Sequence, residues 1–246
     1  MLLTKRLMMA RRVLDTPDCD TPDYDPYWDD VALLLKGDGP DGSTNIIDSS
    51  VNNHSVTVHG NAKISTAQSK FGGSSFVFDG NGGYLAVSDP EMNFVTGDYT
   101  IELFARGAGS QPRDFAVLVA ADIGAQYGTG TLFFRDKSAG NAVAVSHHLT
   151  RPITTSHTLQ FDTSWRHFAL TRGGGTLRLY IDGVLAGSST TTLAMNFSEL
   201  TIGFARYSPS HTSFNGYIDE LRITKGVARY TANFTPPTAP FPTTGP

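Results

Sequence analysis

The sequence predicts an all-β domain, a two-sheet antiparallel sandwich preceded by an extended N-terminal arm. Aromatic residues favour strands and glycines favour tight turns, and the 246 residues include 15 Phe, 9 Tyr and 25 Gly. Only 17% of the residues are charged. From Val31 onward, short apolar or alternating runs follow one another between Gly, Asn, Asp and Ser, and no long helical pattern interrupts them.

Residues 1–30 form the predicted arm, in which positive and negative charges are separated. Residues 1–14 carry bases and no acid, whereas residues 15–30 carry aspartates and no base. The basic block consists of Lys5, Arg6, Arg11 and Arg12. The prolines of "DTPDCDTPDYDP" favour an extended path over regular helix. The arm is either a solvated, disordered leader or an anchor that pairs its charge blocks, together with Tyr27 and Trp28, with a partner.

Residues 31–246 form the predicted sandwich, and its strands follow from the alternation of apolar and polar side chains. The predicted strands are Val31–Leu35, Ser55–His59, Ser75–Asp79, Tyr84–Val87, Tyr99–Ala105, Ala116–Ala120, Thr131–Arg135, Ala142–His147, Thr158–Phe161, Arg166–Arg172, Leu177–Ile181, Glu199–Gly203 and Gly216–Thr224. The clearest hairpin joins "RHFALTR" to "LRLYIDG" through a glycine-rich link. Asp182-Gly183 is a further tight-turn signal.

A family resemblance emerges from the order of several blocks along the chain. These blocks are "SKFGGSSFVFDGNGGYLAV", "YTIELFAR", "SWRHFALTRGGGTLRLYIDGVLAG", "LTIGFA" and "FNGYIDELRITKGVARYTANFTPP". Together they resemble the laminin G-like, or concanavalin A-like lectin/glucanase, jelly roll over nearly all of residues 31–242. The resemblance implies two antiparallel sheets and a protein that binds glycans or proteins, or serves as a structural module.

Two segments resemble the version of this domain that is common in tailed-bacteriophage virion proteins. They are "DPYWDD" before "VALLLKGDGPDGS" and the ending "ITKGVARYTANFTPPTAPFP". We therefore expect a non-enzymatic virion component, such as a capsid decoration, tail or fibre-associated protein. Its expected partners are other capsid or tail proteins, further copies of itself and a host surface glycan. A carbohydrate-binding or adhesion module on a bacterial surface is the alternative, and a glycoside hydrolase is the third hypothesis.

The resemblance also implies a structural calcium ion. In many relatives an Asp on the last strand holds calcium together with oxygens of the chain's first loop, which points to Asp219 and to Asp38 in "KGDGPDGS". Alternatively, Asp219 caps a turn or pairs with an arginine such as Arg222. We expect Glu220 to point to the other side of the strand, toward solvent.

Catalysis is not expected from the carboxylates of this chain. A retaining glycosidase needs two carboxyl groups about 5 Å apart, and none of the four glutamates is followed by an acid two positions later. Glu102 in "TIELFAR" is interpreted as a polar position on a strand. No Cys/His spacing fits zinc, and no Gly-x-Ser-x-Gly elbow or phosphate loop is present in the sequence.

Glycan contacts are expected from predicted loops, because loops carry function more often than strands. The candidates are Arg113, Tyr127, Tyr207 and His211. Single exposed aromatics are also ordinary on protein surfaces, so both interpretations stay open. Asp79 in "FDGNGG" is explained by a turn, with a glycan-binding loop as its alternative.

The remaining features concern partners and the chain's end. The net charge of −4 makes a nucleic-acid surface unexpected, and no apolar run reaches the roughly 18 residues that span a bilayer. The single cysteine, Cys19, excludes an intrachain disulfide. In the proline-rich tail, Tyr230 and Phe234 are expected to pack back on the sandwich. The tail then either shields a sheet edge or docks on a neighbouring subunit.

Overall fold

The computed structural model describes residues 24–88, 97–109, 111, 115–122, 131–136, 142–147, 150–158, 163–190, 199–205 and 212–246. A short 3-10 helix, η1 (Trp28–Asp30), precedes the strands. The strands are β1 (Val31–Leu35), β2 (Val56–His59), β3 (Lys63–Ser65), β4 (Ser75–Asp79), β5 (Tyr84–Val87), β6 (Tyr99–Gly107), β7 (Phe115–Asp122), β8 (Thr131–Asp136), β9 (Ala142–His147), β10 (Thr150–Thr158), β11 (Arg166–Gly173), β12 (Thr176–Ile181), β13 (Val184–Thr190), β14 (Glu199–Ile202) and β15 (Asn215–Lys225).

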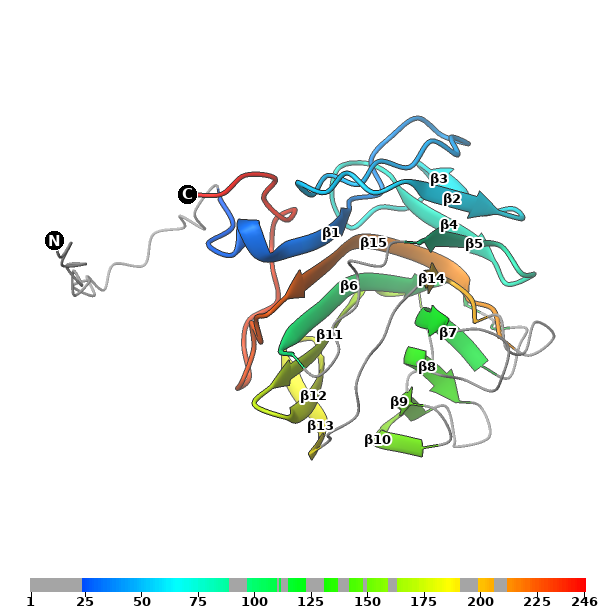
Figure 1. Ribbon diagram of the computed structural model, residues 1–246. Helices are drawn as coiled ribbons and strands as arrows, with labels where there is room; N and C mark the ends of the chain where they lie inside the picture. Colours follow the sequence, from blue (N-terminus) through cyan, green and yellow to red (C-terminus); the bar gives the residue numbers. More distant parts are fainter. Residues whose placement is uncertain are drawn as a thin grey trace, which may run out of the picture.

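The described strands form two antiparallel sheets packed face to face, which confirms the predicted fold class (Figure 1). The first sheet has the order β13-β12-β11-β6-β15-β4-β3, with β1 also paired to β15. The second has the order β10-β9-β8-β7-β14-β5-β2. Buried aliphatic and aromatic side chains from both sheets fill the space between them, among them Leu33, Phe76, Leu85, Phe168 and Ile202.

Strand β15 has a central place in the first sheet. One of its edges pairs with β6, and the other pairs first with β4 and then with β1. The changeover from β4 to β1 coincides with a register shift between Asp219 and Arg222. Glu220 lies in this bulge with a φ of 50°, a conformation that residues other than glycine rarely adopt.

The strand predictions missed several segments. β10 runs from Thr150 to Thr158 and shares only Thr158 with the predicted strand Thr158–Phe161, whose other residues lie outside the described part of the chain. Pro152 lies within this strand, which is tolerated because β10 is at the edge of its sheet. The sequence pattern also predicts neither β3 nor β13.

The tail packs on the outer face of the first sheet instead of running along a sheet edge. Thr100 of β6 donates to Val227 O at 2.9 Å, and Thr171 of β11 donates to Tyr230 O at 2.9 Å. The segment just before η1 reaches the same place, where Asp25 N donates to Thr244 O at 2.8 Å. The start of the described chain and its C-terminus therefore lie side by side at one end of the sandwich (Figure 1).

Candidate functional site

Most of the predicted surface-contact residues lie outside the described part of the chain. Arg113, Tyr127, Tyr207 and His211, predicted to bind glycan, lie outside the described residues. So do the basic residues of the arm, Lys5, Arg6, Arg11 and Arg12. Of the predicted anchor residues, Tyr27 is exposed beside Arg229, whose guanidinium lies 5.0 Å from the ring centroid. Trp28 is partly buried and packs against the buried cluster that contains Phe104 and Phe241.

A buried ionic network lies where the two ends of the chain meet the first sheet. At its centre, Glu102 of β6 is fully buried. Its Oε1 accepts hydrogen bonds from Arg222 Nε at 3.0 Å and Nη2 at 2.8 Å. Its Oε2 accepts from Tyr230 Oη at 2.8 Å and lies 3.2 Å from His167 Nε2. Glu102 is thus much more than a polar position on a strand.

Asp25 connects the N-terminal segment to the same network. Arg222 Nη1 donates to Asp25 Oδ2 at 2.7 Å. Arg229 of the tail binds both carboxylate oxygens of Asp25, at 2.9 and 2.7 Å. We call Asp25, Glu102, Arg222, Arg229 and Tyr230 the terminal clamp. It joins β6, β15, the tail and the segment before η1 with two carboxylates balanced by two guanidiniums.

Aromatic side chains of the tail cover the terminal clamp. Phe241 is buried, and the Arg222 guanidinium lies 3.8 Å from the centroid of its ring. Tyr230 stacks on Phe234 with ring centroids 3.6 Å apart, and both rings meet Tyr180 of β12 edge to face. This confirms that Tyr230 and Phe234 pack back on the sandwich. Water is excluded from the charges, which strengthens their attraction.

The electrostatics of the terminal clamp fix its protonation state. Burial alone would raise the pKa of Glu102, but the guanidiniums of Arg222 and Arg229 and the hydrogen bond with His167 hold it well below its usual range. Burial and the Glu102 charge raise the pKa of Tyr230 above its ordinary value, so its hydroxyl remains a donor. Glu102 is ionised and fully engaged, which suits a structural fastener and not a general acid.

Asp219 is held by backbone amides at the bulge of β15. Its Oδ2 accepts from Lys70 N at 2.8 Å and Phe71 N at 3.1 Å, and its Oδ1 accepts from Glu220 N at 3.0 Å. Burial raises the pKa of Asp219 to about 6, the three amides oppose that rise, and the nearby Asp38 charge adds to it. The Asp219 carboxylate thus joins β15 to the loop before β4.

Glu220 is buried, so the expectation that it faces solvent was wrong. The positive φ of the bulge turns its side chain toward the tail, where Oε2 accepts from Phe241 N at 2.8 Å. Burial raises the pKa of Glu220 to about 7; Lys36 opposes the rise, and Asp219 and Asp38 add to it. We call Asp219 and Glu220 the bulge pair.

The sequence suggested two roles for Asp219, pairing with Arg222 and binding calcium. The contacts of Asp219 bear on both. Arg222 binds Glu102 and Asp25, as described above, and its side chain is 6% exposed. For calcium, Oδ1 of Asp219 accepts a single amide and keeps a lone pair, and Asp38 adds a second carboxylate nearby. The described residues contain no group of three or more Asp, Glu, His or Cys side chains placed to hold a metal. Any calcium there therefore needs backbone oxygens and water as further ligands.

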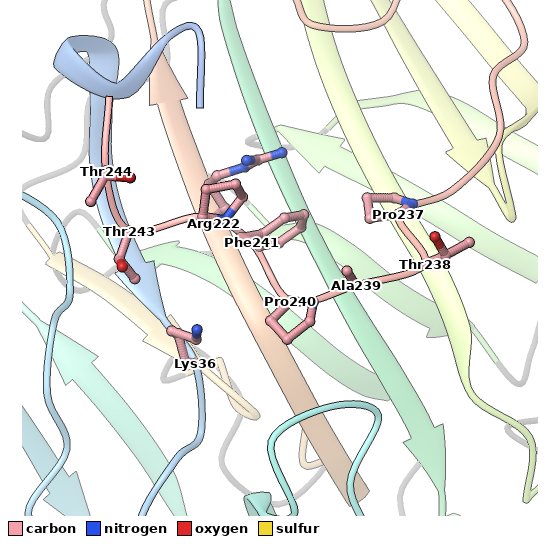
Figure 2. Close-up of a pocket in the computed structure, with 10 residues that line it drawn as sticks. Lys36, Arg222, Pro237, Thr238, Ala239, Pro240, Phe241, Thr243 and Thr244 are labelled. Carbon is pink, nitrogen blue, oxygen red and sulfur yellow. The ribbon is translucent and has the colours of Figure 1, made fainter. Parts of the chain in front are cut away.

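A groove of about 540 Å³ lies between the tail and the β1–β15 edge of the sheet. Figure 2 shows the tail from Pro237 to Thr244 crossing the strands, with Phe241 lying against Arg222. Lys36 lines the other side of the groove and lies 4.0 Å from Asp38. Because the arginine is already paired, the groove offers its prolines, threonine hydroxyls and one lysine to a partner.

Sequence reasoning missed the terminal clamp because its members lie far apart along the chain. Asp25 and Arg229 are 204 positions apart, and Glu102 and Arg222 are 120 apart. A usable signal was present nonetheless. A Glu in the middle of an apolar strand requires a buried cation, and the final strand and the tail each supply an arginine.

Comparisons with known proteins agree with this architecture. A laminin G-like family model, described as the concanavalin A-like lectin/glucanases superfamily, matches residues 79–229, which is more than half of the chain. A search of curated protein sequences finds none that matches. Among the described residues, no helix is both long and apolar enough to cross a membrane.

Several solved structures share the fold at low sequence identity. Domain 4 of AbnA, an extracellular arabinanase from Geobacillus stearothermophilus solved with arabinotriose, has a TM-score of 0.58 and 19% identity, over 80% of this chain and 92% of that one. The binding domain of botulinum neurotoxin DC, in complex with SialylT, has a TM-score of 0.56 and 15% identity. That match covers 81% of this chain and 49% of the neurotoxin chain.

A third similar structure belongs to an enzyme. A mutant Trypanosoma rangeli sialidase displaying trans-sialidase activity has a TM-score of 0.57 and 16% identity, over 80% of this chain. The match spans 31% of the sialidase chain. The fold therefore occurs both in domains solved with glycans and as part of enzymes.

Proposed function

Since the chain belongs to the concanavalin A-like lectin/glucanases superfamily, we propose that it is a non-enzymatic, carbohydrate-binding component of a bacteriophage virion, held to the particle by its N-terminal arm. The single observation that supports the anchoring proposal is the burial of the Asp25 carboxylate in the terminal clamp. That carboxylate is buried between Arg222 and Arg229, so a pull on the arm is transmitted directly to the central strand of the sheet.

Part of the terminal clamp lies in the two segments that resemble virion proteins. Arg229 and Tyr230 belong to "ITKGVARYTANFTPPTAPFP", and Asp25 begins "DPYWDD". Three of the five clamp residues thus belong to these segments. Such a connection helps an attached domain to resist a pull on its far end. Several buried contacts have to break together before the N-terminal segment detaches.

The absence of catalysis is supported by the state of the buried acids that the structure describes. Each of them either faces guanidinium groups, like Glu102, or accepts backbone amides, like Asp48 and Asp219. Hydrolysis of a glycoside needs a protonated acid and a second carboxylate across an accessible groove. Incubation of the purified protein with polysaccharides should release no reducing sugar, and measurable turnover would contradict the proposal.

The carbohydrate ligand is supported by the solved structures of this fold. One of them was determined with arabinotriose and one with SialylT. Screening the purified protein against an array of bacterial and host glycans should yield specific binders. A protein that binds no glycan on such an array would sink this part of the proposal.

The anchoring proposal is tested by removing the arm while keeping Asp25. A variant comprising residues 24–246 retains the terminal clamp and should melt within about 2 °C of the full chain. In infected cells that supply either protein, only the full chain should be found in purified particles. Normal incorporation of the 24–246 variant would overturn the anchor. Glycan binding without any incorporation of the full chain would instead favour a bacterial adhesion module.

We further propose that a calcium ion binds at Asp219 and Asp38. Calcium accepts carboxylate and carbonyl oxygens in loose geometry, and the Asp38 charge is close enough to raise the pKa of Asp219. A ligand that binds only the folded state raises its stability by RT ln(1 + [L]/Kd). The melting temperature should rise when calcium replaces chelator, and Asp38→Asn should reduce the rise. Identical melting in both conditions would count against the ion.

A further inference from the structure

A second polar site lies at the end of the sandwich opposite the terminal clamp. Two links cross there from one sheet to the other, residues 60–62 between β2 and β3 and residues 80–83 between β4 and β5 (Figure 1). They pack closely, since a Cβ added at Gly60 would lie 3.0 Å from Gly83 Cα. Gly60 has a φ of 61°, which a side chain would strain. The two links therefore hold their side chains in a fixed relation.

These links and the first loop enclose a shallow pocket of about 470 Å³. We call it the corner pocket; its polar lining consists of Thr44, Asn61, Lys63 and Asp79 around the half-buried Val77. All four polar residues are exposed to solvent. A small apolar floor with a few convergent polar groups is the usual composition of a small-ligand site.

The carboxylate and the amide of the pocket are fixed relative to each other. Asn61 Nδ2 donates to Asp79 Oδ2 at 2.8 Å, and Asp79 Oδ1 accepts from Asn81 N at 2.9 Å. The second contact confirms that Asp79 closes a turn. Each of its oxygens keeps a second lone pair, and Asn61 keeps its carbonyl oxygen and one N–H. The pair thus presents acceptors and a donor side by side in one orientation.

The charges of the corner pocket restrict the kind of ligand that it suits. Lys63 and Asp79 bring one positive and one negative charge, so the lining is neutral overall. A phosphate or other compact anion would face the Asp79 carboxylate. A neutral molecule with several adjacent hydroxyls can donate to Asp79 and accept from Asn61 and Lys63 at the same time.

We propose that the corner pocket binds a neutral hexose unit of a glycan, with Asp79 and Asn61 contacting adjacent hydroxyl groups and Lys63 a third. This inference rests on the proposed carbohydrate-binding function and gives that function a location. The pocket lies beside the links at the end of the sandwich away from the two ends of the chain (Figure 1). An anchored particle protein would therefore present the sugar site outward.

The test uses free mannose, glucose and galactose as probes and the full chain labelled with ¹⁵N. Addition of at least one hexose should shift the amide signals of Asn61, Lys63 and Asp79, including the Asn61 side-chain amide. Asp79→Asn keeps a turn-forming side chain and removes the charge, while Asn61→Ala removes the amide. Each change should weaken binding by about tenfold or more, because hydrogen bonds to a charged group contribute strongly.

The matched control is Asp41→Asn. Asp41 is also an exposed aspartate that accepts a backbone amide, from Thr66 N at 3.0 Å, but it does not line the pocket. This variant should bind hexose like the wild type, and all three variants should melt like the wild type.

Hexose-induced shifts of amide signals outside the pocket, unaffected by Asp79→Asn, would overturn the corner pocket while leaving the carbohydrate-binding function intact. A chain that binds array glycans but none of the three hexoses would also overturn it, whereas no binding to any glycan would sink both.

Discussion

Glu102 and the bulge pair are buried acids on neighbouring strands, and the tail contacts both sites. Glu102 is surrounded by cationic groups, whereas the bulge pair is surrounded mainly by backbone amides. Glu102 meets two guanidiniums, a histidine and a tyrosine hydroxyl, and its pKa is held well below the usual range. Asp219 and Glu220 meet mainly backbone amides, and burial raises their pKa values to about 6 and about 7. The tail brings Arg229 to the first site and only the Phe241 amide to the second.

The difference shows what keeps a buried carboxylate charged. Amide hydrogen bonds stabilise the anion but do not offset the desolvation of two adjacent carboxylates, whereas guanidiniums do. The terminal clamp is therefore a permanent fastener at every ordinary pH. The bulge pair instead gains and loses protons near neutral pH.

Removing the central cation of the terminal clamp, Arg222, should lower the free energy of unfolding most. Arg222→Met leaves Glu102 and Asp25 with fewer partners in a buried site, and breaking such a pair costs about 3–5 kcal/mol. Denaturation in urea should show this loss in the free energy of unfolding. A loss below about 1 kcal/mol would mean that water reaches the clamp and solvates its charges.

The control for that change is a partly exposed arginine of the same sheet. Arg166 binds Asp182 at 2.8 Å, but both side chains are about 40% exposed, at 41% and 38%. Arg166→Met should therefore cost at most about 1 kcal/mol. Equal losses in the two variants would show that burial does not distinguish the clamp.

Glu102→Gln should give a smaller loss that depends on pH. The folded-state pKa of Glu102 is lowered, so its stabilisation is present above the unfolded value of 4.5 and is lost as pH falls below it. At pH 7 the free energy of unfolding of the variant should be about 3 kcal/mol lower than that of the wild type. This difference between the two proteins should shrink by about 1.4 kcal/mol for each pH unit below 4.5. A difference that does not change with pH would contradict the lowered pKa of Glu102.

Glu220→Gln should change the free energy of unfolding least, and it should raise stability where the other changes lower it. The folded-state pKa of Glu220 is raised to about 7, so the stability linked to its proton is full below 4.5 and lost as pH rises through about 7. Glutamine still accepts the Phe241 amide without the charge. In chelator, the variant should match the wild type at pH 4.5 and be about 1 kcal/mol more stable at pH 8. Lower stability than the wild type at pH 8 would contradict this.

Much of the fold was predictable because it depends on local alternation. Strands β1, β4, β5 and β9 have the bounds that the sequence predicts, since each is a short alternating or apolar run between turn residues. Most of β10 was not predicted because Pro152 argues against a strand unless the strand is known to be at an edge. That knowledge comes only from the sheet order.

The terminal clamp and the bulge pair were less predictable because they depend on tertiary contacts. The resemblance of the last strand and first loop to those of relatives directs attention to Asp219, which the structure shows buried. It does not reveal that the register of β15 shifts at Glu220 and turns this side chain inward. Nor does it reveal that Asp25 belongs to the sandwich, because the acids around it indicate a solvated arm.

The most direct test of the account is a double-mutant cycle between Asp25 and Arg222, using Asp25→Asn, Arg222→Met and the combined variant. If the N-terminal segment is fastened to the central strand, the two changes should couple by about 2 kcal/mol in the free energy of unfolding. Losses that add to within about 0.5 kcal/mol would show that the two residues act independently. The segment would then not be held by the sandwich, and the basis for an anchored domain would be gone.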